Sequence, residues 1–352
     1  MKCTDKKSGQ IRRSQILLHR KRFCLLAAAA AGMLFFSACG TKTYEFEHPY
    51  DVYGTSIHYI QPQNEEDGSE PSRETRSFKT IPFFAQELCI SETESAGAEL
   101  ADASAAEAAG VFYLDQGTIP FAKNIYKKLY PASTTKILTA LTALKHADLT
   151  DVVTVSEQAA NQAGDSSVCG LKAGDQLTLE ELLYGLLLES GNDAADAIAE
   201  HVSGSSENFA SLMNEEAAAV GATRSHFTNP HGLHEEEHYT CVYDLYLLLH
   251  AAFTYEPFQT IVHTAKHTAV YKNASGAAVT QEWETTDKFL TGEVPVPEGV
   301  TVLGGKTGTT NAAGYCLALY SQNASQKPRI SIVMKADSSE HLYTLMSDLL
   351  KQ

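Results

Sequence analysis

Ser133 and Lys136 form the only Ser-x-x-Lys pair in the chain, and their types and spacing suit acyl transfer. Pro131 and Ala132 precede the serine, and a helical pattern of apolar residues follows on one face: Ile137, Leu138, Leu141 and Leu144. The pattern predicts that Ser133 lies at a helix N-terminus, with Lys136 one turn later on the same side. Free N–H groups at such a terminus can stabilise the oxyanion that forms when a serine oxygen attacks a carbonyl.

A lysine can take the proton of that serine only as a neutral amine. With an ordinary pKa of about 10.4, a fraction on the order of 10⁻³ to 10⁻⁴ is neutral at pH 7. The site must therefore lower the pKa of Lys136, either by burial or by a second cation nearby.

The stretch Gly304–Thr309 supplies a candidate for this second cation. Here glycines flank Lys306-Thr307-Gly308, just before a strand-like run, so that Lys306 and the hydroxyls of Thr307 and Thr309 could hold a carboxylate. A third polar element, Ser190-Gly191-Asn192, interrupts two helical patterns at 179–189 and 194–202. A short polar loop between helices is well placed to face a cleft.

Three stretches of the chain resemble, in the same order, the three motifs of the penicillin-recognising serine enzymes: Ser133-Thr134-Thr135-Lys136, Ser190-Gly191-Asn192 and Lys306-Thr307-Gly308. The flanking runs are similar to those of the D-alanyl-D-alanine carboxypeptidases among the low-mass penicillin-binding proteins: Leu129-Tyr130-Pro131-Ala132, Asp193-Ala194 and Asn229-Pro230-His231-Gly232-Leu233. The resemblance covers about residues 108–352.

The resemblance implies a mechanism on a peptidoglycan stem peptide. Ser133 would attack the carbonyl of the penultimate D-alanine, Lys136 would take its proton, and Ser190 with Lys306 would relay a proton to the leaving amine. Asn192 would hold the substrate amide. Lys306, Thr307 and Gly308 would bind the terminal carboxylate of the substrate. The backbone N–H groups of Ser133 and Thr309 would stabilise the oxyanion. β-Lactams would act as inhibitors by acylating Ser133, and no metal or cofactor is implied.

Two departures from the family pattern concern the chain end and position 309. The chain stops soon after its last expected strand, without the C-terminal β domain and amphipathic anchor of many relatives. Position 309 is Thr, where some relatives carry His, which leaves substrate preference open.

The predicted fold is α+β, with an antiparallel sheet built from both chain ends around an inserted helical region, as in the β-lactamase and DD-peptidase folds that the resemblance implies. Residues 111–124 read as a hairpin, and strands are expected at 314–321 and 329–335, followed by an amphipathic helix over 340–351. From Ser133 to about His250 the pattern is helical, and Thr178 with Glu181 predicts a capping box.

The N-terminus indicates export. Residues 2–22 carry eight Lys or Arg residues and lead into a 14-residue apolar run, which is too short for a comfortable membrane span. We expect residues 1–38 to be a signal peptide and Cys39 to be a lipidated first residue that tethers the protein to the outer face of the plasma membrane, with plain secretion as the alternative. Residues 39–107 read as a flexible acidic spacer and residues 108–352 as the catalytic domain.

Removing residues 1–38 leaves 19 basic and 42 acidic residues, a net charge of −23. Such a surface disfavours nucleic acid and anionic lipid as partners. The four later cysteines, at positions 89, 169, 241 and 316, permit disulfides but do not require them.

Three competing functions deserve comparison with the main hypothesis. His231, His234 and His238 stand among glutamates, but their spacing fits no standard zinc signature. A class A β-lactamase usually has Asp at the centre of the second motif and an added catalytic glutamate, whereas Gly191 occupies that centre here. A lipid-tethered sensor or an inactive scaffold would usually need a transmembrane helix to pass a signal inward, and none follows residue 39.

Overall fold

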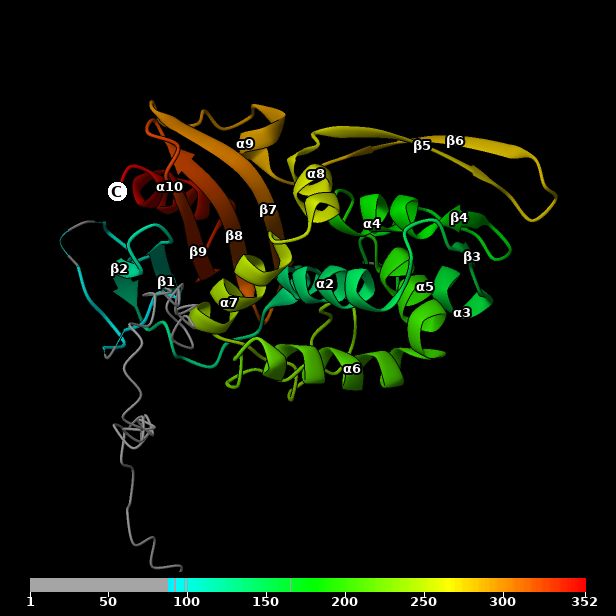
Figure 1. Cartoon of the computed structure of the whole chain (residues 1–352), viewed down its shortest axis with the longest axis horizontal. Coiled ribbons are helices and arrows are strands. Elements are labelled where there is room, and N and C mark those ends of the chain that lie inside the picture. The colour runs from blue at the N-terminus through cyan, green and yellow to red at the C-terminus, as the bar shows by residue number, and fades with distance from the viewer. Residues whose placement is uncertain (1–87, 92, 98, 100, 165) are drawn as a thin grey trace, which may run out of the picture. The chain divides into compact units, whose positions relative to one another are not determined.

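The computed structural model describes residues 88–352 except for 92, 98, 100 and 165 (Figure 1). All described residues belong to one compact unit. The expected signal peptide, the lipidation site Cys39 and the spacer up to residue 87 lie outside the described residues.

Both ends of the described region build one antiparallel sheet, in the order β2-β1-β9-β8-β7. Its strands are β1 (Ala106–Tyr113), β2 (Thr118–Lys123), β7 (Val300–Thr310), β8 (Gly314–Asn323) and β9 (Pro328–Ala336). The predicted hairpin is β1 with β2, and the two predicted later strands are β8 and β9. Lys306, Thr307 and Gly308 lie inside β7, which forms an edge of the sheet.

The sheet is apolar on both faces because helices cover both. Along β9, Ile332 and Met334 belong to a core cluster shared with α7 (Val242–Ala252), whereas Val333 between them belongs to a cluster shared with α10 (Ser339–Leu350). This is the two-residue alternation of a β-strand. The predicted C-terminal helix is therefore confirmed as α10, and it begins where the side chain of Ser338 accepts the N–H of His341.

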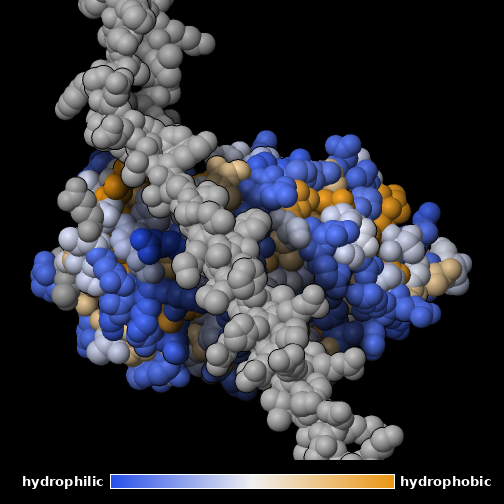
Figure 2. Space-filling model, turned by 90° about the horizontal axis from the view of Figure 1, so that it is seen from below, coloured by the Kyte–Doolittle hydropathy of each residue, from blue (hydrophilic) through white to orange (hydrophobic). Residues whose placement is uncertain are grey.

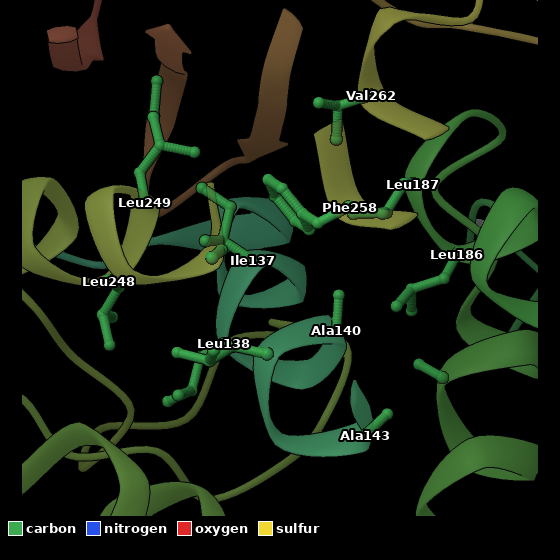
Figure 3. Packing of buried hydrophobic residues seen from close by; sticks show 14 of the residues in the cluster. Ile137, Leu138, Ala140, Ala143, Leu186, Leu187, Leu248, Leu249, Phe258 and Val262 are labelled. Atoms are coloured by element: carbon green, nitrogen blue, oxygen red, sulfur yellow. The ribbon is translucent and has the colours of Figure 1, made fainter. Parts of the chain in front are cut away.

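The helical region, which also includes α7, lies between β2 and β7 in the sequence. Its elements are the 3₁₀ helix η1 (Ala132–Thr135), α2 (Lys136–His146), α3 (Glu157–Ala160), α4 (Leu179–Leu187), α5 (Asn192–Ser203), α6 (Ser206–Ala219), α8 (Glu256–His263) and α9 (Lys288–Thr291). Figure 3 shows α2 at its centre, with Ile137, Leu138 and Ala140 among side chains from α4, α7 and α8. The first half of the predicted capping box is present, since Thr178 Oγ1 accepts the N–H of Glu181 at 3.2 Å.

A second sheet, absent from the sequence-based prediction, runs in the order β3-β4-β5-β6. Its strands are β3 (Val152–Thr154), β4 (Gln176–Thr178), β5 (Lys266–Lys272) and β6 (Ala278–Glu284). The expectation of helix alone from Ser133 to about His250 was therefore wrong at β3 and β4. These two strands have three residues each, too few to show a period of two. The β5–β6 hairpin extends away from the five-stranded sheet (Figure 1).

The packed region starts before the boundary expected at residue 108. Cys89 is fully buried: its N–H donates to Tyr246 Oη and its carbonyl accepts from Tyr243 Oη, both at 2.9 Å. Ala96 pairs with Ala122 of β2. Cys89 and Ala96 thus belong to the folded domain rather than to a spacer.

All four cysteines of the described region are buried and free. Figure 2 shows a mostly hydrophilic face, and large apolar side chains are exposed among the described residues only at Ile90, Val152, Val168 and Val270. Within the described part of the chain, no helix has both the length and the apolar character needed to cross a membrane.

Candidate active site

Ser133 lies on a strained turn that leads into α2. Ala132 has a φ of 48°, a left-handed conformation that costs a non-glycine residue roughly 1–3 kcal/mol and is found where the surroundings enforce it. Ser133 belongs to η1, so the serine precedes the α-helix by one 3₁₀ turn instead of occupying its first turn. The predicted pairing holds, because Lys136 Nζ lies 3.2 Å from Ser133 Oγ.

Lys136 is fully buried, whereas Ser133 is partly exposed. Besides Ser133, its Nζ contacts Asn192 Oδ1 at 2.7 Å and the carbonyl oxygen of His231 at 2.8 Å. Burial lowers the pKa of Lys136 well below its usual value, and the positive charge of Lys306 lowers it further. A neutral amine has two N–H donors and one lone pair. With its donors directed to Asn192 and His231, the lone pair faces the hydroxyl of Ser133.

Lys306 is the second buried lysine, with 1% of its surface exposed. Its Nζ donates to the carbonyl of Thr307 at 3.1 Å. Burial lowers the pKa of Lys306 to about 7, and the charge of Asp287 opposes this effect. The predicted second cation is thus buried within electrostatic reach of Lys136.

Gly308 lets strand β7 pass close to Ser133. A Cβ at this position would lie 2.9 Å from the backbone nitrogens of Ser133 and Thr134. No side chain fits there without moving the turn, so Gly308 acts by its small size. The hydroxyl of the preceding Thr307 lies 2.5 Å from Thr286 Oγ1.

The loop Ser190-Gly191-Asn192 joins α4 to α5, as the sequence predicts. Ser190 has a φ of 60°, and its buried Oγ finds no hydrogen-bond partner among the residues that the structure describes. Asn192 begins α5, and its N–H donates to the carbonyl of Ser167 at 2.8 Å. The hydroxyl of Ser190 is therefore available to donate or accept a hydrogen bond, although Ser190 is not among the described residues that line the cleft around Ser133.

A cleft brings the predicted elements together. It is lined by Ser133, Asn192 and Thr309. The rest of the lining comes from three further segments: Ser166 and Ser167; His231, Gly232, Leu233 and His234; and Thr310, Asn311 and Ala312 at and just after the end of β7. The three motifs, far apart in sequence, thus meet around one partly exposed serine.

A family model described as D-alanyl-D-alanine carboxypeptidase matches residues 94–338. The chain belongs to this family. It is 33% identical over 239 residues to the D-alanyl-D-alanine carboxypeptidase DacF of Bacillus subtilis, covering 66% of this chain and 58% of that protein. DacC of Escherichia coli is 36% identical over 223 residues, covering 60% and 52%. The chain therefore spans little more than half the length of these relatives.

Solved structures agree with the β-lactamase and DD-peptidase type of fold predicted for this family member. A Streptomyces DD-transpeptidase superposes with a TM-score of 0.65 at 28% identity, covering 70% of this chain and 96% of that one. The D-alanyl-D-alanine carboxypeptidase of Mycobacterium tuberculosis gives 0.62 at 29% identity, covering 70% and 89%.

In this member of the carboxypeptidase family, the turn 229–232 also shapes the site, a role that the sequence did not predict. Asn229 Oδ1 accepts the N–H of Gly232 at 2.7 Å, and Gly232 has a φ of 90°. A Cβ on Gly232 would lie 1.9 Å from the carbonyl oxygen of Ala132, so the turn packs directly on the strained residue before Ser133. This contact is what presents the carbonyl of His231 to Lys136. Asn-Pro-His-Gly is a recognisable turn signal, but its target cannot be read from sequence.

His238 joins the segment before the turn 229–232 to the 3₁₀ helix η1. Its Nδ1 accepts the N–H of Thr228 at 3.1 Å, and its Nε2 lies 2.8 Å from Thr135 Oγ1. Burial lowers the pKa of His238 to about 3, so the ring is neutral and donates from Nε2 to Thr135. Among the described residues, no cluster of three His, Cys, Asp or Glu side chains is arranged to hold a metal ion.

Proposed function

We propose that this protein is a serine-type D-Ala-D-Ala carboxypeptidase that removes the terminal D-alanine from peptidoglycan stem peptides through an acyl-enzyme on Ser133. The observation that carries the proposal is the fully buried Lys136, with its Nζ 3.2 Å from Ser133 Oγ and its other contacts made to neutral acceptors. Family membership supports the choice of substrate.

In the acylation step, Ser133 Oγ attacks the carbonyl carbon of the penultimate D-alanine and its proton passes to Lys136. The N–H groups of Ser133 and Thr309 stabilise the oxyanion, a contribution worth about 3–4 kcal/mol per donor in comparable sites. When the peptide bond breaks, a proton reaches the leaving amine through Ser190. The unpartnered hydroxyl of Ser190 suits this relay.

Substrate binding uses the remaining motif residues. Because Asn192 Oδ1 faces Lys136, its amide nitrogen is the group it can offer to a substrate carbonyl. Lys306 and Thr307 hold the terminal carboxylate. β-Lactams acylate Ser133 as substrate mimics and thereby inhibit the enzyme.

Transpeptidation is a second candidate, supported by the similarity to the Streptomyces DD-transpeptidase. The two activities share the acyl-enzyme and differ in whether water or an amine accepts the acyl group. Adding glycine or a stem-peptide amine to the reaction separates them, since only a transpeptidase converts the acyl-enzyme into a new peptide.

We further propose that residues 1–38 form a signal peptide and that lipidated Cys39 anchors the enzyme at the outer face of the plasma membrane. The short apolar run ending in Ser37-Ala38-Cys39 supports this. Expression in a bacterial host followed by fractionation tests it: the chain should be found in the membrane, and Cys39→Ala should release it. Membrane retention of the variant would refute lipid anchoring.

The proposed activity is tested with the full chain and a peptide ending in Lys-D-Ala-D-Ala. We expect stoichiometric release of D-alanine, which Ser133→Ala abolishes. Ser211→Ala, which removes an exposed hydroxyl from α6, is the matched control and should leave the rate unchanged. Rapid penicillin hydrolysis without D-alanine release would instead favour a β-lactamase.

A further inference from the structure

Asp287 is a buried carboxylate with one oxygen unused. It is 2% exposed and caps α9, where its Oδ1 accepts the N–H of Phe289 at 3.0 Å. Its Oδ2 is also buried and has no hydrogen-bond partner among the described residues. A charged oxygen in this state is costly unless a cation compensates it.

The compensating cation is Lys306. Helix α9 packs against β7, and Thr286, next to Asp287, meets Thr307, next to Lys306, through their hydroxyl oxygens. Asp287 and Lys306 act on each other electrostatically: Lys306 favours the ionised carboxylate, and Asp287 favours the ammonium. The two buried groups thus influence each other through space at the edge of the five-stranded sheet, without an ion pair within 4 Å among the described residues.

We propose that Asp287 is a positioning residue that keeps Lys306 protonated, so that Lys306 can hold the substrate carboxylate and keep Lys136 neutral. This inference rests on the proposed function, and it adds that Asp287 controls the protonation of Lys306, the lysine that binds the substrate carboxylate. Asp287 contacts no substrate and acts through Lys306.

The direction of the effect follows from the surroundings. Burial lowers the pKa of Lys306 to about 7 and raises that of Asp287 to about 6, so Asp287 is ionised where Lys306 begins to lose its proton. Tyr343 of α10, which also faces Asp287, is kept neutral by a raised pKa, and the exposed Lys288 and Glu293 pair with each other at 3.8 Å. On the other side, Lys306 faces Lys136, whose charge is already suppressed.

Without the charge of Asp287, Lys306 should lose its proton at a lower pH. Substrate binding needs the ammonium, so kcat/KM falls as pH rises through the pKa of Lys306. Asp287→Asn keeps the cap on Phe289 and removes the charge. We expect the alkaline limb of kcat/KM to move down by about one pH unit, which means about a tenfold loss above the limb, about a twofold loss near pH 6 and little change near pH 5. The loss should appear mainly in KM.

The experiment compares pH profiles of the full chain with the peptide ending in Lys-D-Ala-D-Ala, for the wild type, Asp287→Asn and a control. The control is Asp175→Asn, since Asp175 is also buried and accepts a backbone N–H, from Lys172 at 2.9 Å. Its profile should match the wild type. Asp287→Ser also keeps a capping side chain without its charge. If both variants give the same profile, the change is not due to a folding defect caused by asparagine alone.

Two outcomes overturn the proposal: an unchanged alkaline limb in Asp287→Asn, or an equal loss at every pH in both Asp287 variants. The rate of acylation by benzylpenicillin, measured over the same pH range, provides a readout independent of D-alanine release. If the wild type releases no D-alanine, the proposed function fails, but a shifted limb for acylation still supports the link between Asp287 and Lys306.

Discussion

The two buried lysines of the active site occupy contrasting surroundings. Lys136, on the helical side, contacts a hydroxyl, an amide oxygen and a backbone carbonyl, all of them neutral. Lys306, on the edge strand β7, contacts a carbonyl and has the buried carboxylate of Asp287 as an electrostatic partner. Burial disfavours the ammonium in both places. Carboxylates oppose this effect at both lysines, Asp193 and Asp196 at Lys136 and Asp287 at Lys306, but at Lys136 the positive charge of Lys306 adds to the effect of burial.

This difference assigns complementary states to two residues of the same type. A neutral Lys136 can accept a proton, and a protonated Lys306 can bind a carboxylate and repel a proton from Lys136. In the proposed mechanism, the different surroundings of the two lysines therefore make Lys136 the base and Lys306 the group that binds the carboxylate.

Replacement of Lys136 should have the largest effect. Lys136→Ala removes the base, and we expect acylation by benzylpenicillin to slow by about 10³-fold, within the range for loss of a general base. Lys136→Arg should be equally slow because a guanidinium keeps its proton at any working pH. Stopped-flow or quenched-flow acylation rates check this, and an active arginine variant would break the assignment of Lys136 as the base.

Lys306→Met keeps much of the side-chain volume and removes the charge. We expect kcat/KM for a peptide with a free terminal carboxylate to fall by about 100-fold, since a hydrogen bond to a charged group contributes up to about 3 kcal/mol. The same peptide with a terminal amide is the matched comparison and should lose much less. Equal losses for both peptides would mean that Lys306 does not recognise the carboxylate.

Gly308→Ala tests the close approach of strand β7 to the turn that carries Ser133. Its Cβ would push on the backbone nitrogens of Ser133 and Thr134, 2.9 Å away, and so disturb the oxyanion site. We expect about a tenfold slower acylation, smaller than the loss of a whole oxyanion donor. Gly164→Ala, where a Cβ meets no described atom within 4 Å, is the control. A normal rate in Gly308→Ala would show that β7 has room to move.

The smallest effect concerns stability on the helical side. The pKa of His238 is depressed to about 3 in the folded protein against 6.5 for an ordinary histidine, so the unfolded state binds more protons at acid pH. Stability should therefore fall as pH drops from about 6.5 towards 3, and His238→Gln should reduce this slope. Denaturant unfolding at several pH values measures it, and an unchanged slope would contradict a neutral buried His238.

The sequence predicted the parts of the site that residue types encode locally. Ser133 and Lys136 are one turn apart, the serine loop stands between two helical patterns, and short apolar runs mark β1, β8 and β9 as strands. The carbonyl of His231 could not be predicted, because a backbone carbonyl exists at every position and its use depends on a contact across 95 residues. Asp287 was missed because a lone aspartate before a short helix is typical of an ordinary cap.

The central claim is that Ser133 is acylated with a neutral Lys136 as its base, and intact-mass spectrometry of a reaction with benzylpenicillin tests it most directly. A time course on the full chain should show one long-lived adduct, which peptide mapping places on Ser133 and which is absent from Ser133→Ala. An adduct on Ser133→Ala, or on any other residue of the wild type, would contradict the account.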